Sequence, residues 1–351
     1  MTGPEHTDEP PGLDLARLHA YLAETAPELT GPRLSARLIS GGKSNLTYLV
    51  TTGTDEYVLR RPPLGHVLAT AHDMGREYRV ISALADTAVP VPQALLLCTD
   101  ATVLGAPFYL MRRVPGTVYR RRSQTDEVTA EAKRRLAFDM IDTLAALHAV
   151  EPEMVGLADF GHPTGFLARQ VRRWAGQLDL SRSRDLPGID ELRERLAETV
   201  PVSKRAAIVH GDYRLDNLLV DPQIMRITAV LDWEMATLGD PLTDLGLLMT
   251  YWEALGTGEL ATVGDAVADG VGPAAGFPTG RELIERYAER STVDVSDLDW
   301  YVALGCYKLA VIAEGIHFRY SQGQTVGEGF DRFGVLVFPL IEHGLALTRE
   351  G

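Results

Sequence analysis

Hydrophobic residues recur at intervals of three and four along Leu13–Thr25, which predicts an amphipathic helix near the start of the chain. The pattern then changes to short apolar segments separated by turn-forming residues, which is typical of strands in an antiparallel meander. A second helical pattern, from about residue 73 to 84, interrupts these segments. The predicted strands are ARLIS (36–40), LTYLV (46–50), EYVLR (56–60), QALLLCT (93–99) and PFYLMRRV (107–114). We therefore expect a sheet of about five strands that carries one helix.

Pro115 and Gly116 end this pattern, and from about residue 125 the chain reads as mostly helical except around residues 205–232. The clearest helix is EAKRRLAFDMIDTLAALHAV, residues 131–150. The fold class we predict is α+β, with a small antiparallel lobe followed by a larger helical lobe. Its expected parts are an acidic, proline-rich disordered tail (1–12), an N-terminal lobe (13–114) and a C-terminal lobe (115–351).

Composition narrows the classes of function. A chain of 351 residues exceeds what one hydrophobic core usually serves, which favours two lobes. Cys98 and Cys306 fit no metal or redox spacing, so we expect a reducing compartment and a cytoplasmic location. The net charge of −14 disfavours nucleic acid as a partner. No signal peptide or membrane segment is predicted.

The stretch IVHGDYRLDNLLV, residues 208–220, places polar groups between two apolar anchors. Such a segment fits a loop that is fixed at both ends and directs its polar side chains at a cleft. Asp212 and Asn217 lie five positions apart, and the next apolar segment, ITAVLDWE, ends with Asp232. Mg²⁺ prefers oxygen ligands, which Asn217 and Asp232 can supply, while Asp212 can accept a hydroxyl proton. This set predicts magnesium-assisted phosphoryl transfer with Asp212 free of the metal.

HGDYRLDNLLV followed by VLDWE resembles the catalytic and metal-binding loops of the aminoglycoside phosphotransferase and choline kinase family. GGKSNLTY, YVLRRPP and DWEMATLGDPLTDLG are most similar to the kinase-like domain fused to some acyl-CoA dehydrogenases and to its stand-alone bacterial relatives. The resemblance implies a protein-kinase-like fold, ATP and Mg²⁺ as cofactors, and phosphorylation of a small-molecule hydroxyl acceptor.

The resemblance also implies a nucleotide site on the N-terminal lobe. ISGGKSNLTYLV takes the place of the loop that covers the nucleotide phosphates, with contacts from Gly42, Ser44 and Asn45. Arg60 stands where this fold carries its phosphate-binding lysine, and it keeps the positive charge but presents a planar fork. Glu77, on the following helix, is expected to pair with Arg60.

Adenine recognition is expected on the strands around Arg60. Val58 shares a strand face with Arg60 and would contact the adenine. Met111 would line the back of the adenine pocket, and backbone groups of Arg112 and Val114 would bond to the base.

Two further residues are predicted to act structurally. Asp244, near a helix start, should accept backbone N–H bonds from the catalytic loop. His210 is expected to brace that loop through hydrogen bonds and not to carry protons.

Several interpretations of the acceptor and the activity stay open. A hydroxyacyl-CoA is one candidate acceptor, whereas the basic residues of YVALGCYKLAVIAEGIHFRY disfavour a polycationic aminoglycoside. A catalytically impaired nucleotide-binding module is the main alternative, because of Arg60 and the atypical covering loop. A metal-dependent hydrolase is disfavoured by the lack of histidine-rich ligands. The twelve positions between Asp232 and Asp244 are too few for a protein kinase's activation segment. The sequence does not distinguish ATP from GTP or define an oligomeric state.

Overall fold

The computed structural model describes residues 10–40, 45–64, 73–254, 271–324 and 330–348. The chain forms two compact units. Unit 1 comprises Met1–Pro115 and the short segment Leu231–Glu234, and unit 2 comprises Gly116–Val230 and Met235–Gly351. Each unit has its own arrangement of helices and strands.

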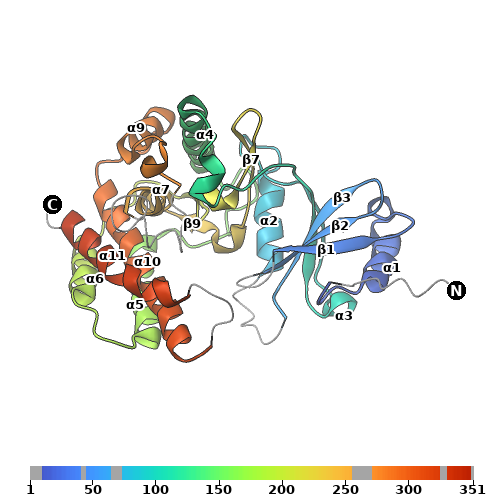
Figure 1. The fold of residues 1–351 in the computed structure, drawn as a ribbon, viewed down its shortest axis with the longest axis horizontal. Helices are drawn as coiled ribbons and strands as arrows, with labels where there is room; N and C mark the ends of the chain where they lie inside the picture. Colours follow the sequence, from blue (N-terminus) through green and yellow to red (C-terminus); the bar gives the residue numbers. More distant parts are fainter. Residues whose placement is uncertain (1–9, 41–44, 65–72, 255–270, 325–329, 349–351) are drawn as a thin grey trace. The chain divides into compact units, whose positions relative to one another are not determined.

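Unit 1 is built on one five-stranded sheet in the order β1-β2-β3-β5-β4, with all neighbouring strands antiparallel (Figure 1). Its strands are β1 (Ser35–Ser40), β2 (Leu46–Thr51), β3 (Glu56–Arg61), β4 (Ala94–Cys98) and β5 (Phe108–Arg112). Each of them lies within two residues of the segment predicted from the hydrophobic pattern. The five-stranded antiparallel sheet is therefore confirmed.

Three helices of unit 1 begin after an aspartate whose side chain caps the first turn. Asp14 precedes α1 (Leu15–Thr25), Asp73 precedes α2 (Met74–Leu84) and Asp100 precedes the short α3 (Ala101–Leu104). Each carboxylate accepts a backbone N–H of the new helix, which stabilises an otherwise unpaired donor. The sequence pattern did not predict α3, because four residues show no period.

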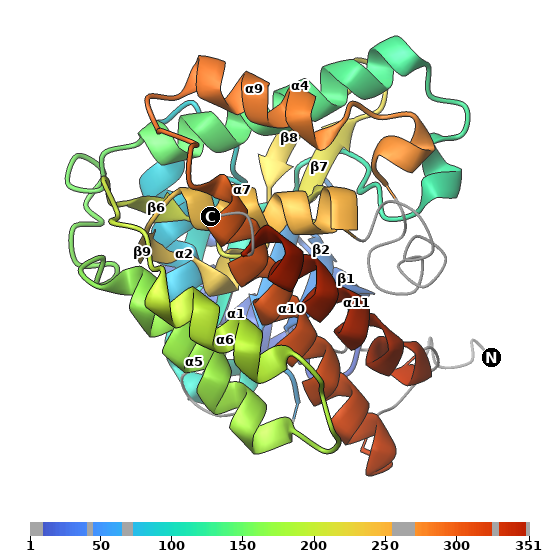
Figure 2. The same cartoon turned by 90° about the vertical axis from the view of Figure 1, so that its left-hand side faces the viewer.

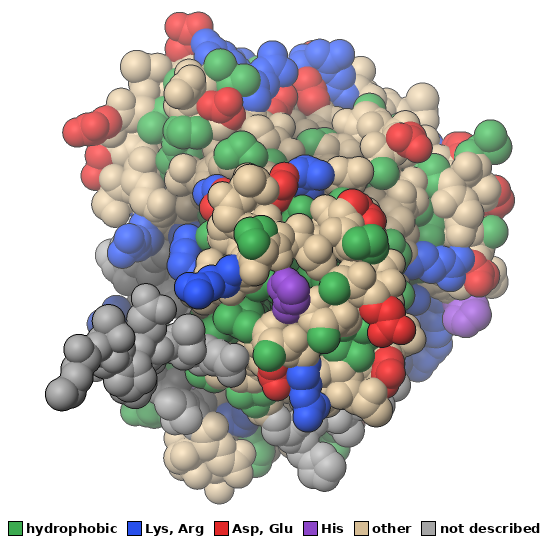
Figure 3. All heavy atoms as spheres, turned by 90° about the vertical axis from the view of Figure 1, so that its right-hand side faces the viewer, with side chains coloured by type: hydrophobic (Ala, Val, Ile, Leu, Met, Phe, Trp, Pro, Cys, Tyr) green, Lys and Arg blue, Asp and Glu red, His purple; other side chains and the backbone are tan. Residues whose placement is uncertain are grey.

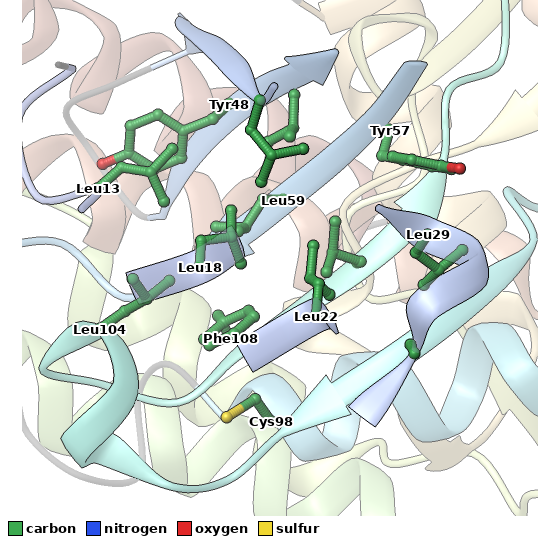
Figure 4. Close-up of a cluster of buried hydrophobic side chains, with 14 of the residues drawn as sticks. Leu13, Leu18, Leu22, Leu29, Tyr48, Tyr57, Leu59, Cys98, Leu104 and Phe108 are labelled. Atoms are coloured by element: carbon green, nitrogen blue, oxygen red, sulfur yellow. The ribbon is translucent and has the colours of Figure 1, made fainter. Parts of the chain in front are cut away.

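The core of unit 1 lies between α1 and one face of the sheet (Figure 4). Leu18 and Leu22 of α1 belong to the same buried cluster as Leu59 and Phe108 of the strands. Because side chains alternate along β3, Leu59 belongs to this core while Arg60 belongs to the other face, which α2 covers. Pro11 and Gly12, which precede α1, also contact the sheet, since the Tyr48 hydroxyl donates to the Pro11 carbonyl and Arg61 donates to that of Gly12.

Unit 2 is mainly helical, and α10 (Leu298–Ser321) lies at its centre, packed against α11, α7 and α5 (Figure 2). The other α-helices within the described part of unit 2 are α4 (Ala130–Ala149), α5 (Phe166–Ser181), α6 (Ile189–Glu198), α7 (Leu242–Met249), α9 (Gly280–Arg290) and α11 (Phe333–Leu347). Among the described residues, α10 alone has the length and hydropathy of a membrane span. Of the most apolar 18-residue stretch of this helix, 72% is buried inside the structure, as is typical of a core helix.

Two short antiparallel ribbons interrupt the helices of unit 2. One pairs β6 (Ala207–Val209) with β9 (Thr237–Gly239), and the other pairs β7 (Leu218–Asp221) with β8 (Arg226–Val230). The loop between β6 and β7 contains Asp212 and Asn217. The strand β9 lies beyond residue 232, where we expected the strand region to end, because a three-residue strand has no detectable alternation.

Both cysteines are free and buried. On the face of the molecule shown in Figure 3, acidic, basic and apolar side chains are interspersed.

Candidate active site

Arg60 lies on the face of the unit 1 sheet where the nucleotide residues were predicted. In the β3–β5 ladder Arg60 is directly opposite Tyr109, and Val58 is directly opposite Met111. Residues opposite each other in an antiparallel pair point to the same face, so these four side chains form one surface. Val58 and Met111 form its apolar part, and Arg60 and Tyr109 form its polar part.

The Arg60 guanidinium bridges two carboxylates. Its Nε lies 3.2 Å from Oε2 of Glu77, and its Nη2 donates to Oδ1 of Asp232 at 2.9 Å. The predicted pair of Arg60 with Glu77 is therefore present. Burial opposes the charged guanidinium, but Tyr109 and the two carboxylates more than compensate and raise the pKa of Arg60 above its ordinary value. Arg60 thus stays a cation although it is only 8% exposed.

Glu77 is 1% exposed and is surrounded by donors. Besides Arg60, the Tyr109 hydroxyl donates to its Oε2 at 2.9 Å and the Asn45 amide donates to its Oε1 at 2.8 Å. Burial raises the pKa of Glu77, and the charge of Arg60 opposes that rise. The Asn45 amide also donates to Glu234 at 3.3 Å. Asn45, at the end of the covering loop, is thereby joined to α2 and to the segment that carries Asp232.

Asp232 has an unusual backbone conformation, with a φ of +65°. Residues other than glycine seldom adopt positive φ, and such positions are concentrated at functional sites because the strain must be held by surrounding contacts. Here the contact is the ion pair with Arg60. One third of the Asp232 side chain remains exposed, so its carboxylate is open to a further ligand.

The remaining nucleotide residues are only partly described. Gly42 and Ser44 lie outside the described residues. The Arg112 N–H donates to the Gln93 carbonyl, so this donor is already used inside the sheet. The Val114 backbone bonds to none of the residues that the structure describes.

In unit 2, Asp244 holds the start of the loop between β6 and β7, residues 210–217, which is the predicted catalytic loop. Its carboxylate accepts the backbone N–H of His210 at 2.6 Å and that of Gly211 at 2.7 Å. The predicted role of Asp244 is confirmed by these two bonds. His148 places its Nε2 at 3.2 Å from the same carboxylate, and Tyr287 lies 2.7 Å from the other ring nitrogen.

These contacts change the pKa of the Asp244 carboxyl. Burial alone would raise the pKa of the carboxyl, but the hydrogen bond and charge of His148, together with His210, hold its pKa below the ordinary value. His210 is fully buried, and its Nδ1 accepts the backbone N–H of Asp212 at 3.2 Å. The predicted hydrogen bonding of His210 inside the loop is thus present.

Asp212 and Asn217 are held next to each other. The Asn217 amide nitrogen donates to the backbone carbonyl of Asp212 at 2.8 Å and to its carboxylate at 3.1 Å. Both bonds use Nδ2 of Asn217. Among the described residues, no donor is bonded to its Oδ1. The Tyr251 hydroxyl lies 3.4 Å from the other Asp212 oxygen, and Arg214 lies 3.7 Å from the carboxylate. The Asp212 side chain is 30% exposed and can meet a ligand.

The sequence interpretation missed several partners of these residues. Tyr109 could have been predicted, because it lies two positions before Met111 on a predicted strand and therefore on the same face. Tyr251 lies seven positions after Asp244, a spacing that puts both on one side of a helical segment. Nothing in the sequence marked His148 and Tyr287, which come from α4 and α9 and meet Asp244 only in the folded unit.

The comparisons with known proteins agree with this geometry. Residues 35–283 match the model of the phosphotransferase enzyme family, and the chain belongs to that family. A protein from Ralstonia eutropha, assigned as an aminoglycoside phosphotransferase, is 32% identical, with a TM-score of 0.82 over 96% of this chain and 98% of that one. The protein-kinase-like α+β fold is therefore confirmed, and the family supports a small-molecule phosphotransferase.

Two further similarities extend the comparison. A thermostable mutant of aminoglycoside phosphotransferase APH(4)-Ia, in ternary complex with AMP-PNP and hygromycin B, shares the fold at 17% identity, with a TM-score of 0.60 over 95% of this chain and 98% of that one. Acyl-CoA dehydrogenase family member 11 of Gallus gallus is 34% identical over 350 residues, which cover 96% of this chain and 44% of the relative. The chain thus spans less than half the length of this curated relative.

The Gly211→Ala variant tests the tight approach of the catalytic loop to Met235. Gly211 has a φ of +83°, and a Cβ there would lie 2.7 Å from the Met235 carbonyl oxygen. We expect a loss of about 2 to 4 kcal/mol in the free energy of unfolding, because the left-handed conformation and the overlap add. Gly156→Ala is the matched control, since its φ is +73° but nothing lies within 4 Å. Equal losses for both variants in urea unfolding would contradict this assignment.

Asp244→Asn tests the network behind the loop through its pH dependence. Because folding lowers the pKa of Asp244 from 3.8, its contribution to stability is complete above that value and is lost as the pH falls below it. We expect Asp244→Asn to cost about 2 to 4 kcal/mol near pH 7, since buried N–H donors lose a charged acceptor.

The difference in unfolding free energy between wild type and Asp244→Asn should be constant near neutral pH and should shrink as the pH falls below 3.8, measured by urea unfolding at pH 7 and at a series of pH values below 3.8. Asp126→Asn, at an exposed position, serves as the control. A difference that stays constant over this range would show that the ionised carboxylate is not what stabilises the loop.

Proposed function

We propose that the protein is an ATP- and Mg²⁺-dependent phosphotransferase that moves the γ-phosphate to a hydroxyl of a small molecule. The observation that carries this proposal is the setting of Asp212. Its carboxylate is partly exposed, is held by Asn217 and sits in a loop fixed from behind by Asp244. A carboxylate so placed can orient a hydroxyl and accept its proton.

In the proposed reaction the acceptor oxygen forms a bond to the γ-phosphorus while the bond to the bridging oxygen of ADP breaks. The hydroxyl proton passes to Asp212. Asn217 and Asp232 are the proposed metal ligands, because each offers an oxygen that the described protein contacts leave available. A bound Mg²⁺ would neutralise charge on the nucleotide phosphates.

The residues of unit 1 would bind the nucleotide. Arg60 is the proposed positive partner of the phosphates, and Glu77 fixes the direction of its guanidinium. The covering loop would add backbone and side-chain donors to the phosphates from Gly42, Ser44 and Asn45. The apolar surface of Val58 and Met111 would contact the adenine, with backbone groups of Arg112 and Val114 at its edge.

The acceptor is proposed at the level of chemical class, a small molecule with a hydroxyl group. A hydroxyacyl-CoA is one candidate, supported by the similarity to acyl-CoA dehydrogenase family members. We further propose a cytoplasmic protein without a nucleic-acid partner, in keeping with its acidic charge of −14.

The alternative is a nucleotide-binding module without catalysis. The observation that favours it is the contact of Arg60 with Asp232, because this pair engages both a proposed phosphate ligand and a proposed metal ligand. Such a module would bind ATP but release no ADP in response to an acceptor.

Asp212→Asn separates the two functions. If Asp212 accepts the hydroxyl proton, ADP release from Mg·ATP, with water or a screened alcohol as acceptor, should fall by roughly 10²- to 10⁴-fold. ATP affinity should be nearly unchanged, because no nucleotide contact is assigned to Asp212. Asp216→Asn, at a neighbouring carboxylate, is the control. An unchanged rate in Asp212→Asn, or no turnover in the wild type, would contradict the proposed reaction.

A further inference from the structure

A pocket in unit 2 lies directly beside the catalytic loop. It is formed where α5 faces α10, two helices that pack side by side (Figure 2), and the backbone of Gly211 forms part of its wall. The space that it encloses is small, about 60 Å³, and it widens into a depression of about 540 Å³ that is open to solvent. Gly211 directly precedes Asp212, which is not itself part of the pocket wall, but the charge of Asp212 acts on Lys308 in that wall.

Apolar and cationic groups and one carboxylate, that of Asp244, line this pocket. Phe166, Trp174 and Leu304 provide apolar wall, whereas Arg173 and Lys308 each bring a positive charge. The Lys308 ammonium lies 5.5 Å from the centre of the Trp174 ring, and the Arg173 guanidinium lies 5.5 Å from the same ring. Two cations thus converge on one indole at the pocket wall.

Lys308 is tied to the catalytic loop itself. Its Nζ donates to the Gly211 carbonyl at 2.7 Å, which uses one of the three N–H donors of an ammonium. Burial lowers the pKa of Lys308, while the charges of Asp212 and Asp244 oppose that shift. In the described part of the chain no ion pair joins the Lys308 ammonium to Asp212 or Asp244, and its hydrogen-bond partner is the Gly211 carbonyl.

Two like charges in a partly buried pocket repel each other unless an anion lies between them. Arg173 is exposed at its end of the pocket, so it can turn towards a ligand at little cost. Gln170, on the preceding turn of α5, adds an amide to the same wall. A polycation would meet two positive charges here and would be disfavoured.

We propose that the acceptor is an anion, whose carboxylate or phosphate group binds to Lys308 and Arg173 while its hydroxyl is presented to Asp212. This inference rests on the proposed phosphotransfer and specifies its substrate class. The apolar wall of Phe166, Trp174 and Leu304 would hold the carbon chain between the two groups. Lys308 then fixes both the acceptor and the carbonyl that precedes Asp212.

Matched pairs of small ligands test the anion preference without knowledge of the natural acceptor. The pairs are 4-hydroxybutyrate with 4-hydroxybutyramide, and glycerol 3-phosphate with glycerol, measured by ligand-observed NMR titration. We expect at least one anion to bind about tenfold more tightly than its neutral partner, which corresponds to one charge-assisted contact. The pair that shows the larger ratio identifies carboxylate or phosphate as the recognised group.

Variants of the two cations show whether this preference belongs to the pocket. Lys308→Met should bring the ratio of anion affinity to neutral-partner affinity close to one, and Lys308→Arg should retain part of the preference. Arg173→Gln, which leaves the loop contact intact, should lower the ratio by a few fold. Arg172→Gln is the matched control, because Arg172 lies on the same helix but not on the pocket wall. Thermal unfolding of each variant shows that the unit remains folded.

The inference is overturned if neither anion binds more tightly than its neutral partner in the wild type, or if Arg172→Gln and Arg173→Gln have equal effects. ADP release in the presence of the same ligands provides a separate readout. An anion preference that depends on Lys308 without any ADP release would support the pocket and contradict the proposed phosphotransfer. ADP release that is faster with the neutral partners would support phosphotransfer and contradict the anionic acceptor.

Discussion

The bonds from the His210 and Gly211 backbone to the Asp244 carboxylate are the interaction on which the catalytic loop depends. They fix the start of a segment that has little regular structure of its own, and Asp212 follows directly after Gly211. The carboxylate can do this in a fully buried setting because His148 and two backbone donors compensate its charge. The loop is thus held from the core of unit 2, and Asp212 and Asn217 are left at the surface.

In unit 1 a buried cation, and not a buried carboxylate, holds the neighbouring groups in place. Arg60 is a buried cation, and it organises Glu77 from α2 and Asp232 from the segment after β8. A planar guanidinium can serve two carboxylates at once, which the compact ammonium of lysine does less well. This gives a physical reason for arginine at a position where the family resemblance implies lysine. The positive φ of Asp232 is consistent with a carboxylate held for a ligand.

The sequence predicted the sheet of unit 1 and the main helices well, because each has a hydrophobic period long enough to be recognised. It failed for α3 and β9, which span four and three residues. Of the site, the pair of Arg60 with Glu77 was expected from the family resemblance, and the contact of Asp244 with the loop was expected from its place near a helix start. His148, Tyr287 and the convergence of Arg173 and Lys308 on Trp174 depend on how distant helices pack, and no local pattern encodes that packing.

We propose that Asp232 and Asn217 bind the metal ion of a Mg·ATP complex. A calorimetric titration with ATP, with and without Mg²⁺, on the wild type and on Asp232→Ala, tests it most directly. The account predicts that ATP binding by the wild type strengthens with Mg²⁺ and that this dependence disappears in Asp232→Ala. Absence of ATP binding in the wild type, or the same Mg²⁺ dependence in both proteins, would contradict it.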